Sequence, residues 1–172
     1  MKPRYIVFIT IASLVAIVGA SILGVQLMSH SSPTSNSSTP GTTTPGLPTV
    51  SAVAGDAPTI SAPTGPAPKV LTKSDVIVGT GAEVLPTSTL TVHYTLMAWS
   101  TGKIIESSWG GQPAVFPLAQ VVEGWQKGLP GAKVGGRRLL VLPPEMGYGA
   151  AGAGPIGPNE TLIFVVDIIG VS

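Results

Sequence analysis

The sequence has no cysteine, only two histidines and little charge of either sign. Without cysteine the chain can form no disulfide and has no thiolate for a metal ion or for nucleophilic attack. Neither histidine has a second histidine or a cysteine to complete a metal site, and no serine lies in a Gly-x-Ser-x-Gly pattern. The glycine-rich stretch at 147–157 has no lysine, so it is not typical of a phosphate loop. We therefore expect no metal and no cofactor, and a hydrolase, a transferase or a redox enzyme is disfavoured.

Aromatic residues are also scarce, with nine in 172 residues, so the position of a tryptophan is informative. Trp125 lies in a mostly apolar segment, 116–129, which flanking prolines limit to two or three helical turns. On a helix Trp125 would share one face with Val121 and Val122. From these residues alone, that face is either the core side of an amphipathic helix or the floor of a binding pocket.

The first 28 residues contain a long apolar run. Residues 5–28 carry no charge, and as a helix they would be about 36 Å long, enough to cross a hydrocarbon core of about 30 Å. Lys2 and Arg4 precede the run, and such basic flanks stay on the cytoplasmic side. Residues 1–28 are therefore predicted to be a transmembrane anchor or a signal segment. The anchor is favoured because no Ala-x-Ala-like cleavage site follows. The rest of the chain should lie outside the cytoplasmic membrane, or be secreted if the segment is cleaved.

Residues 29–68 have a different composition, with eight serines, eight threonines, eight prolines and a single charged residue, Asp56. Such a segment does not bury enough apolar area to offset the entropy of ordering it. We predict an extended, disordered linker here. In residues 69–172, seven Lys or Arg balance seven Asp or Glu, which argues against a nucleic-acid partner.

Residues 69–172 are predicted to form one α+β domain. Apolar and polar residues alternate over 89–96, as in a half-buried strand, and 100–103 reads as a hairpin turn before a short strand at 104–105. Further strands are expected at 76–78, 137–142 and 161–171. Arg137 and Arg138 are expected to be solvated at the start of their strand. Strands, one short helix and then strands indicate an antiparallel sheet of five or six strands packed against that helix.

An apolar pocket without a nucleophile suits one reaction, rotation about an X-Pro peptide bond. Amide resonance gives this rotation a barrier of about 20 kcal/mol. In the twisted transition state the carbonyl carries less negative charge, so its dipole is smaller than that of the planar amide. A dry aromatic pocket therefore disfavours the planar form more than the twisted form, which is differential binding of the transition state.

Six motifs carry a resemblance to a known family. In order along the chain they are VHYT (92–95), GKIIESSW (102–109), VVEGW (121–125), VGGRR (134–138), PPEMGYGAAGAG (143–154) and PNETLIFVVDII (158–169). Their order and spacing resemble those of the FKBP-type peptidyl-prolyl cis-trans isomerases over nearly all of 69–172. The resemblance implies a five- or six-stranded antiparallel sheet wrapped around one short helix.

The resemblance also implies roles for individual residues. Trp125 would be the floor on which the substrate proline sits, and Tyr148 would offer its hydroxyl to a substrate carbonyl. Ile156 would be the rim residue whose backbone amide binds the substrate chain, and Glu106 would hold the hydroxyl of Tyr94. The pocket walls would be formed by Tyr94, Phe116, Val121, Val122 and Phe164.

The sequence departs from the family pattern at the predicted wall. Ile105 stands where the family usually has phenylalanine, and Glu106 stands where it usually has aspartate. The leading hypothesis is an active isomerase that assists folding outside the cytoplasmic membrane. The alternatives are a weakly active or non-catalytic module that binds proline-containing peptides or acts as a chaperone, and a purely structural surface domain. Expected partners are proline-containing polypeptides, macrolide inhibitors and, through the N-terminal segment, a membrane. The protein is expected to be a monomer.

Overall fold

The computed structural model describes residues 46–172. They contain six strands and one short α-helix: β1 (Thr72–Ile77), β2 (Thr89–Ala98), β3 (Ile104–Ser107), β4 (Ala114–Pro117), α1 (Glu123–Gly128), β5 (Arg137–Leu142) and β6 (Leu162–Val171). All strands pair antiparallel in one sheet of order β1-β5-β6-β2-β3. The outer edge of β2 is shared, because β4 pairs with its first half and β3 with its second half. The α+β prediction is confirmed, with six strands rather than five.

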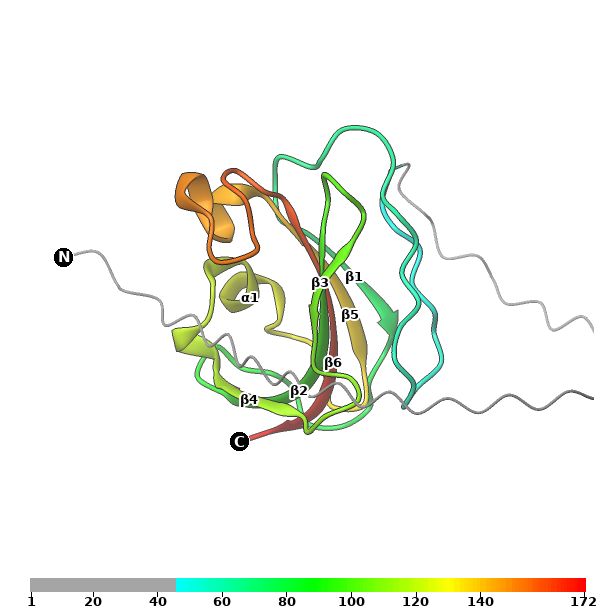
Figure 1. Cartoon of the computed structure of the whole chain (residues 1–172). Coiled ribbons are helices and arrows are strands. Elements are labelled where there is room, and N and C mark those ends of the chain that lie inside the picture. Colours follow the sequence, from blue (N-terminus) through cyan, green and yellow to red (C-terminus); the bar gives the residue numbers. More distant parts are fainter. Residues whose placement is uncertain (1–45) are drawn as a thin grey trace, which may run out of the picture. The chain divides into compact units, whose positions relative to one another are not determined.

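Alternation along the strands gives the sheet two apolar faces. On β6, Phe164 and Val166 belong to the main core, which also contains Trp125 of α1. Their neighbours on β6, Ile163 and Val165, point the other way and belong to a second apolar cluster. Helix α1 therefore covers only one side of the sheet, the inner face, and lies in the curve of the strands (Figure 1). The opposite, outer face needs a different cover.

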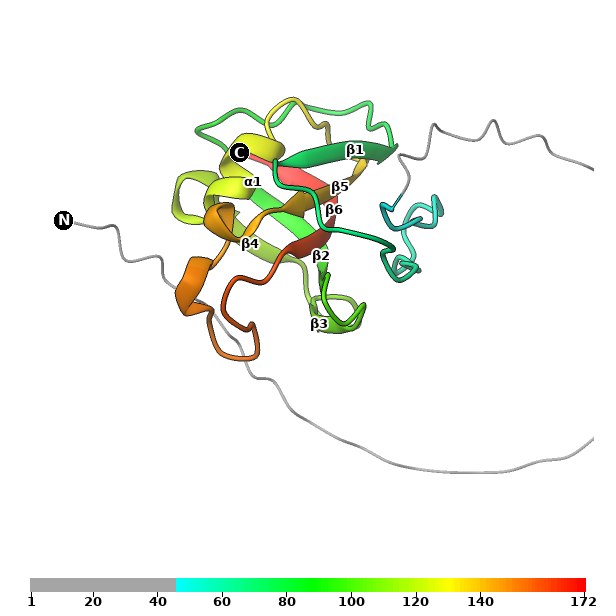
Figure 2. The ribbon, with the colours of Figure 1, turned by 90° about the horizontal axis from the view of Figure 1, so that it is seen from above.

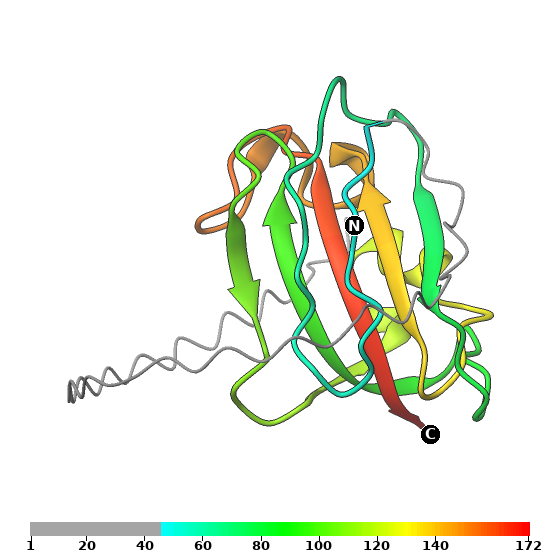
Figure 3. The ribbon, with the colours of Figure 1, turned by 90° about the vertical axis from the view of Figure 1, so that its right-hand side faces the viewer.

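An N-terminal segment covers the outer face. Residues 46–66, which we call the strap, run up and back across the sheet on the side opposite α1 (Figures 2 and 3). Val50 and Ile60 pair across the strap in an isolated antiparallel bridge, and backbone hydrogen bonds flank it, from Ser51 to Thr59 and from Ser61 to Thr49, each 3.0 Å. The strap is thus a narrow hairpin-like loop laid on the sheet.

Within the predicted disordered linker at 29–68, the strap at residues 46–66 is ordered on the sheet instead. Its apolar side chains pack on the second cluster, which comprises Met97, Leu139, Val141, Ile163 and Val165, while Leu47, Val50 and Ile60 supply the cover. Composition averaged over forty residues hides these three side chains. In the structure they gain apolar burial that a solvated linker would not have. Residues 29–45 and the predicted anchor or signal at 1–28 lie outside the described residues. Within 46–172, no helix is both long and apolar enough to cross a membrane.

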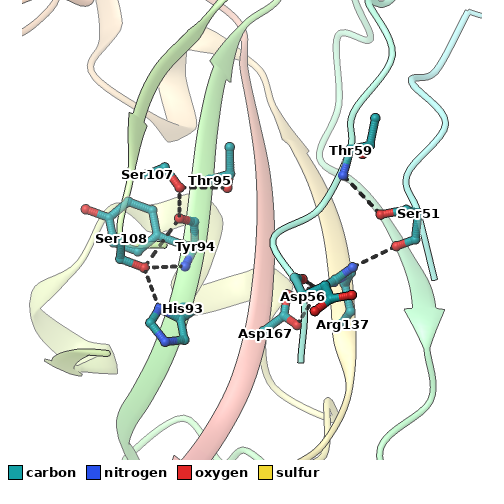
Figure 4. A network of polar contacts seen from close by, with 10 residues as sticks. All are labelled: Ser51, Asp56, Thr59, His93, Tyr94, Thr95, Ser107, Ser108, Arg137 and Asp167. Atoms are coloured by element: carbon teal, nitrogen blue, oxygen red, sulfur yellow. Dashed lines mark hydrogen bonds and ion pairs between the residues drawn. The ribbon is translucent and has the colours of Figure 1, made fainter. Parts of the chain in front are cut away.

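Arg137 ties the strap to the sheet, contrary to the prediction that it is solvated. Its side chain is fully buried, and its guanidinium donates two hydrogen bonds of 2.8 Å to the carboxylate of Asp167. It also donates to the backbone carbonyls of Ser51, at 2.8 Å, and Asp56, at 2.6 Å (Figure 4). A buried guanidinium needs such a set of acceptors to offset its lost hydration. Arg138 is also buried, with 6% of its surface exposed.

Candidate active site

Trp125 lies on a helix shorter than the sequence suggested. A 3₁₀ turn at Leu118–Gln120 comes first, and α1 begins only at Glu123. Val121 and Val122 precede the helix with extended backbone, so they do not share a helical face with Trp125. Both valines nevertheless pack against the same core as Trp125. The predicted shared helical face is therefore wrong, although all three residues meet in one core.

Three aromatic rings surround the indole of Trp125. Its ring centroid lies 5.8 Å from that of Tyr94, 5.9 Å from Phe116 and 5.3 Å from Phe164, with interplanar angles between 81° and 87°. Edge-on packing of this kind is favourable beyond the area it buries. Only 3% of Trp125 and 4% of Phe164 is exposed, whereas Tyr94 and Phe116 are half-buried. The cluster is therefore dry at its base and reaches solvent at its rim.

Strand pairing explains why these aromatics meet. Tyr94 lies on the inner face of β2. Phe164 lies on the adjacent strand β6, where it pairs with Leu96 of β2. Phe116 comes from β4, which pairs with the other edge of β2. The described residues contain seven aromatic side chains of Phe, Tyr and Trp type, and five of them, including Tyr148, pack in or against this core. Such a concentration in an aromatic-poor chain marks a site rather than general core filling.

Glu106 accepts a short hydrogen bond from the hydroxyl of Tyr94, with 2.5 Å between the oxygens. Burial, then this hydrogen bond and the charge of Glu106, raise the pKa of Tyr94 well above its ordinary value of 10. Tyr94 therefore stays protonated, and its proton is engaged by Glu106. The longer side chain of glutamate, in place of the usual aspartate, still reaches the phenol.

Tyr148 offers a second phenol at the site. Burial, and then the negative charge of Glu106, raise the pKa of its hydroxyl, so it too remains a donor at neutral pH. Tyr148 packs against the aromatic core from the loop after β5, where it directly precedes the 3₁₀ turn Gly149–Ala151. Within residues 46–172 its hydroxyl has no hydrogen-bond partner, so it can donate to a ligand.

The backbone amide of Ile156 is already used inside its own loop. It donates to the carbonyl of Ala153 at 2.9 Å, and Ala153 returns a bond of the same length. The role of this amide in binding the substrate chain stays a prediction, and the Ile156 side chain is 8% exposed and belongs to the core. The amide of Val122 is a better donor, because it has no acceptor in the described part of the chain and starts the turn that carries Trp125. No sequence signal marked this donor, because valine is a disfavoured N-cap residue and the helix was expected to begin earlier.

The structure brings all ten predicted site residues together. Glu106 joins through its bond to Tyr94. The other nine lie in or against one apolar core: Trp125, Val122, Ile156 and Phe164 are buried in it, and Tyr94, Ile105, Phe116, Val121 and Tyr148 pack against it. The remaining two tryptophans of the chain lie elsewhere. Trp109 stacks on His93, with centroids 4.4 Å apart, and Trp99 packs with the second cluster. Among the described residues no group of His, Asp or Glu is arranged to hold a metal ion.

Residues 81–169 match the family model of FKBP-type peptidyl-prolyl cis-trans isomerases. The chain belongs to this family. It is 48% identical over 100 residues to a probable FK506-binding protein of Corynebacterium glutamicum, an alignment that covers 58% of this chain and 85% of the relative. Its enzymatic activity is that of an FKBP-type peptidyl-prolyl cis-trans isomerase.

Solved structures agree with the family assignment. The crystal structure of FkpA from Escherichia coli is 37% identical, with a TM-score of 0.56 over 59% of this chain and 48% of that one. The crystal structure of AtFKBP13 is 32% identical, with a TM-score of 0.55 over 60% of this chain and 98% of that one. The FKBP domain is thus the shared part, and the fold predicted from the six motifs is confirmed.

Proposed function

We propose that this isomerase acts on X-Pro bonds of polypeptides outside the cytoplasmic membrane, and that the proline ring binds in the aromatic cluster on Trp125. The observation that carries the site is the enclosure of Trp125 by Tyr94, Phe116 and Phe164. Four aromatic rings exclude water from a proline ring without offering it a charge. The location is supported by the uncharged run at 5–28 with Lys2 and Arg4 before it.

The geometry supports catalysis by desolvation together with directed hydrogen bonds. A planar X-Pro amide loses more hydration on entering the cluster than the twisted form does, so the barrier of about 20 kcal/mol falls. Tyr148 donates its hydroxyl to a substrate carbonyl, and the amide of Val122 donates to a second one. Tyr94, held by Glu106 at 2.5 Å, forms a stable wall rather than a proton donor to substrate. No proton leaves or joins the substrate in this scheme.

Activity and inhibitor binding can be tested together on the full-length chain. We expect acceleration of X-Pro isomerisation in a protease-free assay, and inhibition by FK506, the ligand in the name of the relative from Corynebacterium glutamicum. Tyr148→Phe removes one hydroxyl and should lower kcat/KM by about fivefold to tenfold, since one hydrogen bond contributes about 1 kcal/mol or slightly more. A fully active Tyr148→Phe variant would show that this phenol does not bind the substrate.

The location outside the membrane needs a separate measurement. External protease added to intact cells should degrade the isomerase domain while a cytoplasmic marker stays intact. Replacing Lys2 and Arg4 by glutamine should weaken the orientation signal. Protection of the domain in intact cells would contradict the proposed location and leave the isomerase activity unaffected.

A weakly active enzyme is the second candidate, and Ile105 is the observation that favours it. Its side chain is half-buried and packs against the aromatic core, where a phenylalanine would add a further ring. We expect Ile105→Phe to raise kcat/KM by about tenfold if the native wall limits proline binding, since the added apolar burial is worth about 1–2 kcal/mol. An unchanged kcat/KM would show that the native wall is already sufficient.

A further inference from the structure

Helix α1 depends on strand β5 for its position. A helix of six residues is too short to be stable alone in water. Two glycines let it lie directly on the strand: a Cβ atom on Gly124 would overlap Leu142, and one on Gly128 would lie 2.7 Å from Leu140. Four helical residues rise about 6 Å and two strand residues about 6.6 Å. Alternate residues of β5 therefore meet successive turns of α1.

Arg138 is the next alternate residue of β5, and it meets the end of the helix. Its Nη1 donates to three consecutive backbone carbonyls, those of Gly128 at 3.0 Å, Leu129 at 3.3 Å and Pro130 at 3.2 Å. The last carbonyls of a helix have no intrahelical donor and carry the negative end of its dipole. A buried guanidinium here donates hydrogen bonds to these carbonyls, and its positive charge interacts favourably with the dipole.

Asp75 holds the other side of the same guanidinium. Its two carboxylate oxygens accept from Nε at 2.6 Å and Nη2 at 3.0 Å, and Asp75 is the direct cross-strand partner of Arg138 on β1. The arginine is therefore held by the sheet and is not free to follow the helix. The turn that it contacts is bonded to the site, because the amide of Leu129 donates to the carbonyl of Trp125 at 3.0 Å.

We propose that Arg138, oriented by Asp75, is a positioning residue for the isomerase. It sets the place of α1 along β5 and thereby the depth of the Trp125 indole among its three aromatic neighbours. The proposal rests on the isomerase activity and on Trp125 as the proline platform. Arg138 does not take part in the chemistry, and its effect on substrate passes through the helix.

The alternative is that Arg138 only stabilises the fold, and the chain offers a matched control. Arg137 is its neighbour on the same strand, is also buried and likewise donates two hydrogen bonds to one aspartate, Asp167. It faces the strap instead of α1. A general loss of stability would affect both variants, whereas misplacement of Trp125 should follow from Arg138 alone.

The experiment compares Arg138→Met and Arg137→Met in the full-length chain, well below both melting temperatures. We expect Arg138→Met to lower kcat/KM by about tenfold or more, since small misplacements at a site have effects of this size. Arg137→Met should stay within about twofold of the wild type. Arg138→Lys keeps the charge but lacks the guanidinium fork, so it should fall between Arg138→Met and the wild type.

Fluorine NMR reports the surroundings of each tryptophan through its chemical shift, which a loss of stability alone does not change in the folded protein. The chain has three tryptophans, so 5-fluorotryptophan labelling gives three resonances, and Trp125→Phe assigns the one at the site. Arg138→Met should shift the Trp125 resonance. Arg137→Met should shift that of Trp109, whose ring centroid lies 5.9 Å from the guanidinium carbon, and leave Trp125 in place.

A folded Arg138→Met protein with kcat/KM within twofold of the wild type, or an unmoved Trp125 resonance, would overturn the proposal. So would an equal loss of activity in Arg137→Met. If Arg138→Met does not fold, Asp75→Ala decides, because it leaves the arginine on the helix carbonyls but removes both carboxylate acceptors that β1 provides. About threefold lower kcat/KM with a shifted Trp125 resonance supports the proposal, and no change in either contradicts it. An inactive wild type would instead overturn the isomerase function, and the resonance would still report the hold on Trp125.

Discussion

Arg137 and Arg138 are neighbours in sequence and act on opposite faces of the sheet. Each is buried, and each binds both carboxylate oxygens of an aspartate directly across the sheet, Asp167 on β6 for Arg137 and Asp75 on β1 for Arg138. Their remaining donors differ. Those of Arg137 reach the strap, and those of Arg138 reach the end of α1. One strand thus organises the active site on its inner face and the cover on its outer face.

The two faces should respond differently to mutation. Changes on the inner face should alter catalysis and stability together, because the core and the site are the same set of side chains. Changes on the outer face should alter stability alone, because no predicted site residue lies in the second cluster.

Trp125→Ala should have the largest effect. Truncation of a buried tryptophan costs about 3–5 kcal/mol of unfolding free energy, and loss of the proline platform should lower kcat/KM by about a hundredfold. Trp99→Ala, on the outer side, is the control. It removes a half-buried ring and one 3.3 Å bond to the carbonyl of Gly65, so it should lower the melting temperature with little change in kcat/KM. An equal loss of kcat/KM in Trp125→Ala and Trp99→Ala would show that the two faces do not differ in their effect on catalysis.

Gly124→Ala should have the second-largest effect. The added methyl group overlaps Leu142, which is fully buried and has no room to move. Overpacking of this kind costs about 1–3 kcal/mol and outweighs the helical preference for alanine of about 1 kcal/mol. Displacement of α1 should also lower kcat/KM several-fold. The matched control is Gly111→Ala, whose methyl group would lie 3.6 Å from its nearest neighbour. If Gly124→Ala were stabilising, contact between α1 and β5 would not limit the position of the helix.

Ile60→Asp probes the strap. A carboxylate placed against the second apolar cluster loses hydration without a partner, so we expect the free energy of unfolding to fall by about 2 kcal/mol. The value of kcat/KM should remain within twofold. Val53→Asp serves as the control, because Val53 also lies on the strap but is 56% exposed. Urea unfolding followed by circular dichroism measures both, and equal stability of the two variants would show that the strap does not cover the sheet in solution.

Glu106→Gln should have a smaller effect on stability than Ile60→Asp, about 1 kcal/mol, because glutamine still accepts a bond from Tyr94 without the charge. The pKa of Tyr94 should fall towards 10, since the negative charge of Glu106 no longer adds to the effect of burial. The sign follows from linkage: native Tyr94 holds its proton more tightly than unfolded Tyr94, so its contribution is complete below pH 10 and is lost as pH rises above 10.

Tyrosinate absorbance during an alkaline titration checks this shift. The variant should ionise at lower pH than the wild type and lose less stability above pH 10. Glu123→Gln, which removes an exposed ion pair with Lys127, should change stability by less than about 0.5 kcal/mol and leave the titration unchanged.

Much of the inner face could be predicted from the sequence. Period-two alternation over β2 and the turn at 100–103 are local signals, and the structure confirms both. The role of Trp125 as the centre of an aromatic cluster followed from its rarity and from the ordered motifs. Strand β4 was not predicted, because four residues that end in Pro117 do not display a period.

The outer face and the burial of the two arginines could not be predicted in the same way. The partners of the two arginines lie 30 and 63 residues away, and the strap carbonyls lie more than 80 residues away. A pair of arginines at a strand start has no local feature that indicates burial. Composition identified the strap as polar. Whether it packs on the sheet depends on three apolar side chains and on an apolar sheet face whose residues lie much later in the sequence.

The divided edge of β2 has a consequence for an enzyme that handles chains with exposed backbone. β3 and β4 are four residues each, and at the opposite edge β1 carries an irregularity between Asp75 and Ile77. Short or kinked edges offer an approaching polypeptide few consecutive backbone groups with which to pair. A client chain can therefore be held at its proline and released without being added to the sheet as another strand. The same feature protects the isomerase from joining the aggregates of its own substrates.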